Sequence, residues 1–155
     1  MITDFEQDVR AGFIAAKLGD RINEFAEVDV HFVLPLQVFT RYKTLIDEVT
    51  GGEFNVAAGY NLVLLYTDPQ DSQRAGTVLF GRDLDGLNAA WSGVLNDIAA
   101  EPDKAERHQK FMAAHSYFRS ALWVKPSPSD PCASKNLLPR RAGPEKKSFW
   151  GRFLN

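Results

Sequence analysis

The sequence predicts an α+β fold, with about four helices packed on one face of a small, mostly antiparallel sheet of three to four strands. Three observations support this prediction. Apolar residues recur at helical spacing near the start of the chain and again between residues 83 and 124. Short apolar and β-branched runs, separated by turn residues, lie in the middle. Strands that cluster between helices are typical of the α+β class.

The first expected element is a helix from Asp4 to Ala26. Thr3 and Glu6 have the spacing of a capping box, which satisfies free amide groups in the first turn. Gly19, followed by Asp20, interrupts the pattern, so we expect a kink or a break there. The apolar residues of this helix recur every three to five positions: Phe5, Val9, Phe13, Leu18, Ile22 and Phe25.

A strand over residues 28–34 and a second helix should follow. The strand run is β-branched and partly alternating. Pro35 ends it and suits the first turn of a helix. Gly51 and Gly52 stop that helix, because glycine takes the left-handed cap conformation without a Cβ penalty. The apolar face of the helix comprises Leu36, Phe39, Tyr42, Leu45, Ile46 and Val49.

Two further strands are expected to form a hairpin. Residues 61–67 and 75–81 are apolar runs with β-branched residues. Residues 68–73 between them are rich in Pro, Asp and Ser, which favour turns. We therefore expect the two runs to pair antiparallel, and residues 54–58 to add a short strand ahead of them.

The last two expected helices run from about residue 83 to 100 and from about 103 to 124, with Pro102 between them. Asp83 or Asp85 should cap the first of them. The residues expected to face inward are Leu84, Leu87, Trp91, Val94, Leu95 and Ile98 in the first helix, and Phe111, Met112, His115, Phe118, Leu122 and Trp123 in the second.

Residues 1–124 thus form one predicted globular domain, large enough to bury a single core. The composition changes after Val124, since five prolines lie between residues 126 and 144 among Ser, Gly and charged residues. We expect residues 125–144 to be a flexible linker and residues 145–155 to be an amphipathic C-terminal peptide. The single cysteine, Cys132, excludes an intramolecular disulfide.

The motifs of catalytic, cofactor and metal sites are missing from the sequence. His108 and His115 are seven residues apart, whereas metal ligands on a helix are typically three or four apart and are joined by further ligands. His31 is expected on the exposed side of its strand, away from Val30 and Phe32. There is no glycine-rich phosphate motif and no nucleophile elbow. We predict a non-enzymatic protein without cofactor or metal; the alternative is an enzyme whose site is assembled from non-local residues.

The charge is distributed unevenly along the chain. Residues 1–124 carry 11 basic and 18 acidic residues, a net charge of −7, and residues 125–155 carry 7 basic and 2 acidic residues, a net charge of +5. Such a division indicates a tail with a separate partner. The acidic body would repel phosphates, so nucleic acid is not expected as a partner.

The C-terminal peptide is the most informative part of the sequence. If residues 145–154 are wound as a helix, four large apolar side chains fall in one arc flanked by basic residues. A helix this short is not stable alone in water, so it orders only on a surface that covers its apolar face. Three surfaces fit: the body itself, a groove on another protein, or an anionic membrane. The residues expected to contact it are Lys146, Lys147, Phe149, Trp150, Arg152, Phe153 and Leu154.

These features together predict a cytoplasmic binding protein of the adaptor, inhibitor or immunity/anti-defence type. Its acidic body would meet one partner, because complementary charge speeds encounter, and its C-terminal peptide would dock on another protein. The alternative is a peripheral adaptor tethered through the same peptide to the inner face of the membrane. The cytoplasmic expectation rests on the acidic first residues, which do not resemble a secretory signal, and on the lack of a long apolar run.

Overall fold

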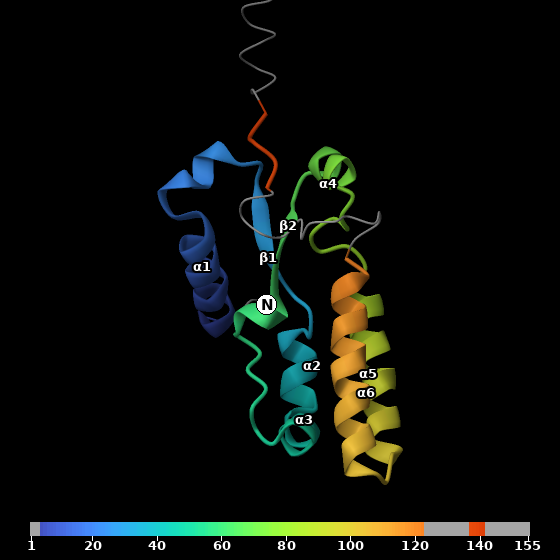
Figure 1. Cartoon of the computed structure of the whole chain (residues 1–155). Coiled ribbons are helices and arrows are strands. Elements are labelled where there is room, and N and C mark those ends of the chain that lie inside the picture. The colour runs from blue at the N-terminus through green and yellow to red at the C-terminus, as the bar shows by residue number, and fades with distance from the viewer. Residues whose placement is uncertain (1–3, 123–136, 142–155) are drawn as a thin grey trace, which may run out of the picture.

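The structure is a computed structural model that describes residues 4–122 and 137–141 of the chain. Within these residues the fold is α+β, as predicted, with six α-helices and one two-stranded antiparallel sheet. The sheet lies between α1 (Asp4–Leu18) on one side and the hairpin of α5 (Leu84–Ala100) and α6 (Lys104–Ser120) on the other (Figure 1). The predicted numbers of three to four strands and about four helices are not matched in the described part of the chain.

The expected interruption of the first helix is confirmed. The α-helix ends at Leu18, and a 3₁₀ helix, η1 (Gly19–Glu24), follows it. Gly19 has a φ of 53°, in the left-handed region that ends a regular α-helix. Thr3, the first residue of the expected capping box, lies outside the described residues.

The sheet consists of β1 (Val28–Phe32) and β2 (Leu62–Tyr66), in a register that pairs Val28 with Tyr66 and Phe32 with Leu62. The predicted hairpin was therefore wrong, because β2 pairs with the earlier strand and not with residues 75–81. Every residue of β2 is buried. Its partner is decided by which segments cover both of its faces, and a local sequence pattern does not contain that information.

Residues 68–73, predicted as a turn, instead begin a helix, α4 (Pro69–Ala75). The Asp68 carboxylate accepts a hydrogen bond from the Gln70 amide at 2.8 Å, and Pro69 lies in the first turn. The residue types that favour turns are also those that start helices, which explains the wrong prediction. Gly76, with a φ of 75°, ends α4.

The strands predicted at residues 54–58 and 75–81 do not form. The backbone of residues 76–81 is hydrogen-bonded to separate parts of the chain: Val78 N donates to Leu122 O, just after α6, at 2.9 Å, and Phe80 N donates to Tyr66 O, at the end of β2, at 3.0 Å. Residues 54–58 lead through a turn into a short 3₁₀ helix, η2 (Gly59–Asn61). The apolar residues in both runs pack against neighbouring elements without joining a ladder.

The helix predicted between residues 35 and 49 is divided at Tyr42 into α2 (Leu36–Arg41) and α3 (Lys43–Thr50). Tyr42 has φ and ψ of −109° and 20°, outside the helical range. Gly51 ends α3 in the left-handed conformation, with a φ of 66°, as predicted.

The last two predicted helices are confirmed as α5 and α6. Asp103 caps α6 by accepting hydrogen bonds from two backbone amides. Asp83 precedes α5, but its side chain makes no capping hydrogen bond. Two residues predicted to face inward are largely exposed, Leu84 by 45% and Met112 by 51%. Trp123 lies outside the described residues.

Two groups of buried side chains make up most of the core. The sheet cluster comprises Leu18, Ala26, Val30, Phe32, Val56, Leu62, Leu64, Tyr66 and Leu137. The helical cluster comprises Leu34, Val38, Ile46, Trp91, Leu95, Ile98 and Phe111. The indole Nε1 of Trp91 donates a hydrogen bond to Val33 O at 2.9 Å, which links the helical cluster to the end of β1. A smaller group on the other face of the sheet includes Val63, Leu65 and Leu122.

Candidate functional site

The residues predicted to contact a partner lie outside the described part of the chain. They are Lys146, Lys147, Phe149, Trp150, Arg152, Phe153 and Leu154. The structure does describe residues 137–141, which we call the anchor segment, inside the predicted flexible linker. Figure 1 shows this segment between η1 and α4, at the end of the molecule opposite the α5–α6 loop. Leu137 is buried and Leu138 is half-buried, whereas the other three residues of the segment are exposed; the rest of the predicted linker lies outside the described residues.

The backbone of the anchor segment is paired with the chain just before β1. Pro139 forms an antiparallel bridge with Phe25. On either side of this bridge, Ala26 N donates to Leu138 O at 2.9 Å, and Arg140 N donates to Glu24 O at 2.8 Å. The segment therefore binds in the manner of an added strand, through main-chain hydrogen bonds.

Side chains hold both ends of the anchor segment. Leu137 is 7% exposed and belongs to the sheet cluster. At the other end, the Arg141 guanidinium lies 3.1 Å from a carboxylate oxygen of Asp68 and 3.1 Å from one of Asp71. The Asp71 side chain is only 6% exposed, so the arginine compensates a buried negative charge. This combination of an apolar contact and an ion pair fixes where the C-terminal region leaves the body.

The sequence does not indicate the anchor segment, because the surrounding prolines dominate the composition of this stretch. Two adjacent leucines, followed by Pro139 and two arginines, are nevertheless unusual in a stretch expected to stay in water. Asp68 and Asp71, which form ion pairs with Arg141, lie about 70 positions earlier in the chain, so only the tertiary structure brings these charges together.

His115, on α6, and Asn61, the last residue of η2, form a buried polar contact. The Asn61 side-chain oxygen accepts hydrogen bonds from Leu34 N at 2.8 Å and from His115 Nε2 at 2.9 Å. Because the oxygen can only accept, His115 carries its proton on Nε2. Burial, followed by the charge of Arg119, lowers the pKa of His115 to about 4. The pair is therefore neutral near pH 7, and it joins α6 and η2 to the backbone of Leu34, which follows β1.

A second histidine, His31, lines a cavity of about 410 Å³ between α1, the end of β1 and the residues around Leu84. Expected to be exposed, it is half-buried, and burial together with the nearby Arg10 lowers its pKa to about 4. Arg10 is itself paired, with Glu6 at 2.9 Å and Asp29 at 3.2 Å. With a pKa of about 4, the imidazole of His31 is uncharged near pH 7.

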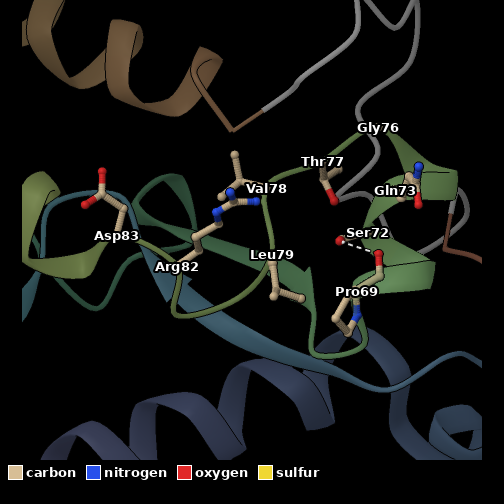
Figure 2. Close-up of a pocket in the computed structure, with 9 residues that line it drawn as sticks. All are labelled: Pro69, Ser72, Gln73, Gly76, Thr77, Val78, Leu79, Arg82 and Asp83. Atoms are coloured by element: carbon tan, nitrogen blue, oxygen red, sulfur yellow. Dashed lines mark hydrogen bonds between the residues drawn. The ribbon is translucent and has the colours of Figure 1, made fainter.

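A larger cavity of about 710 Å³ lies beside the C-terminal end of α4, and we call it the α4 cavity. Figure 2 shows Ser72 and Thr77 on its α4 side and Arg82 extending alongside Val78. The Ser72 hydroxyl donates to Pro69 O at 3.0 Å. The complete lining comprises Pro69, Ser72, Gln73, Gly76, Thr77, Val78, Leu79, Arg82 and Asp83. It combines hydroxyl, amide and guanidinium groups with an apolar wall.

Residues 4–122 and 137–141 contain no group of three or more His, Cys, Asp or Glu side chains placed to hold a metal ion. None of the helices in this part of the chain is both long enough and apolar enough to cross a bilayer. No family model, no curated protein and no solved structure gives a significant match to the chain.

Proposed function

We propose that this chain is a non-enzymatic, cytoplasmic binding protein, of the adaptor, inhibitor or immunity/anti-defence type, that docks on another protein through residues 145–155. The observation that carries this proposal is the anchor segment, which is seated on the body just before the C-terminal peptide begins. A peptide that starts from a fixed point is held at high effective concentration near any surface that the body contacts.

The length of chain beyond the anchor sets the reach of the peptide. Trp150 follows Arg141 by nine residues, which span at most about 30 Å when extended. A partner bound through Trp150 therefore lies within contact distance of the body. This geometry supports a single partner that meets both surfaces, with an apolar groove for the aromatic side chains and a basic surface for the acidic body.

The second candidate is a peripheral adaptor on an anionic membrane. It is favoured by the three basic residues of the C-terminal peptide, Lys146, Lys147 and Arg152, each of which contributes about 1 kcal/mol near an anionic surface. The aromatic residues would insert at the interface. A single short peptide gives weak and reversible attachment.

Affinity capture with matched variants tests the proposal. The full chain, Trp150→Ala and a chain ending at Arg141 are compared as baits, with Tyr117→Ala as the control because Tyr117 is a 69% exposed aromatic residue on α6. Trp150→Ala and the shortened chain should lose a captured protein that Tyr117→Ala retains. Their melting temperatures should stay within about 2 °C of that of the full chain, since a peptide that docks on a partner adds little to the stability of the free protein.

Vesicle sedimentation distinguishes the second candidate. Vesicles of phosphatidylglycerol and phosphatidylcholine are compared with vesicles of phosphatidylcholine alone. Binding to the anionic vesicles that depends on Trp150, without a captured protein, would favour the membrane adaptor. If the chain ending at Arg141 behaves like the full chain in both assays, the C-terminal peptide is not the docking element.

A further inference from the structure

A buried hydroxyl group, that of Thr77, lines the α4 cavity (Figure 2). Thr77 is 5% exposed, and its Oγ1 atom has no hydrogen-bond partner within residues 4–122 and 137–141. Buried hydroxyl groups are nearly always hydrogen-bonded, because an unpaired one destabilises the folded state. An unpaired hydroxyl at the wall of a cavity therefore points to a missing partner in that cavity.

The same cavity is also lined by a cation, Arg82. In the described part of the chain, the Arg82 guanidinium has no ion pair and no hydrogen bond. The neighbouring carboxylate of Asp83 does not supply one, because it is folded over the first turn of α5, 2.4–2.7 Å from the point where a Cβ on Gly86 would lie. Arg74, on the other side of α4, differs because it faces Asp71 at 3.7 Å.

We propose that the α4 cavity binds a small organic anion, a carboxylate or a phosphate monoester. The guanidinium of Arg82 pairs with the anionic group, since its donors match the geometry of both carboxylate and phosphate. The Thr77 hydroxyl donates a hydrogen bond to the ligand. The organic part of the ligand lies on Val78 and Leu79, which form the apolar wall. The volume of about 710 Å³ is within the range of small-molecule sites.

The carboxylate of Asp83 at the rim limits the charge of the ligand. A polyanion would be repelled by this group, whereas a ligand with one anionic group at the Arg82 end is not brought against it. The ligand class is therefore a small apolar body that carries one anionic group, a carboxylate or a phosphate monoester, at the Arg82 end. This site is independent of the C-terminal peptide, so it can fail or succeed separately from the proposed function.

Backbone amide NMR titrations of the full chain test the proposal. Benzoate and phenyl phosphate are the probes; acetate and inorganic phosphate lack the apolar part, and benzyl alcohol lacks the charge. One or both aromatic anions should give saturable shifts at Thr77, Val78 and Leu79, with a dissociation constant of about 1 mM or lower. The tighter of the two identifies the head group. The three other compounds should bind more weakly.

Two variants and a matched control complete the test. Arg82→Gln should lower the affinity at least about tenfold, and Arg74→Gln should leave it unchanged. Thr77→Val should lower the affinity while raising the melting temperature of the free protein, because it removes an unpaired buried hydroxyl without changing the shape of the side chain. The proposal is overturned if neither aromatic anion gives saturable shifts, if Arg82→Gln binds as the wild-type chain does, or if Thr77→Val lowers the melting temperature.

Discussion

The helical cluster and the sheet cluster are built in different ways. The helical cluster takes most of its residues from helices α2, α3, α5 and α6, and α5 contributes three of them at regular helical spacing, Trp91, Leu95 and Ile98. The sheet cluster collects residues from the end of α1, both strands, the loop at Val56 and Leu137 of the anchor segment. The helical cluster depends on periodicity within helices, and the sheet cluster depends on contacts between distant segments.

This difference explains which expectations were confirmed. In an amphipathic helix the buried residues are set by the 3.6-residue period, which can be read locally. In the sheet cluster, a strand has no intrinsic partner, and the surfaces that cover the strand decide its pairing. The same difference predicts how the stability of each cluster changes with mutation or acid, and three experiments can test this.

The largest loss of stability is expected from Trp91→Ala, in the helical cluster. Trp91 is 0% exposed and loses both its packing and its hydrogen bond to Val33 O. We expect a loss of about 3–5 kcal/mol in the free energy of unfolding. Urea unfolding followed by circular dichroism measures it, with Tyr117→Ala as the exposed control. A loss below about 1 kcal/mol would contradict the central position given to this residue.

An intermediate loss of stability is expected at acidic pH, through His31 in β1 and His115 in α6. Burial lowers the pKa of His31 and of His115 from 6.5 to about 4, so both stay neutral in the folded protein. The unfolded chain takes up protons below pH 6.5, so the stability falls as the pH decreases from 6.5 towards 4. The loss is roughly 2–3 kcal/mol for each histidine.

Chemical denaturation at a series of pH values measures this dependence. His31→Gln and His115→Gln should each remove about half of the slope between pH 6.5 and pH 4, because glutamine does not titrate in this range. A slope unchanged in both variants would show that other groups, such as paired carboxylates, cause the acid sensitivity.

The smallest of the three losses of stability is expected from Leu137→Ala, in the sheet cluster. Leu137 lies at the edge of the sheet cluster, so its truncation should cost about 2 kcal/mol, at the low end for a buried leucine. The loss should be local. Hydrogen exchange at the amides of Ala26 and Arg140, which bond across the anchor segment, should become faster, while the amides of α5 keep their protection.

Leu138→Ala is the matched control for this experiment, because Leu138 is only half-buried. It should change the exchange at Ala26 less than Leu137→Ala does. If Leu137→Ala leaves the exchange at Ala26 unchanged, the anchor segment is not held by its leucine. If it destabilises α5 equally, the two halves of the core unfold as one unit.

The candidate sites were less predictable than the fold class. The sequence predicted an interacting C-terminal peptide from its charge and aromatic residues, and that peptide stays a prediction. It did not indicate the α4 cavity, because Thr77 was assigned to a strand and Arg82 fell between that strand and the next helix. It did not indicate the anchor segment either, since Arg141 and Asp71 are far apart along the chain.

The sequence alone determined the α+β class, the three longest helices, the two strands, and the glycines that end α1 and α3. These depend on periodicity and on backbone conformation over a few residues, which each segment carries in itself. The tertiary structure alone decided that β1 pairs with β2, that α4 is a helix, and that residues 137–141 are seated on the body. Those outcomes depend on burial and charge pairing between residues that only the folded chain brings together.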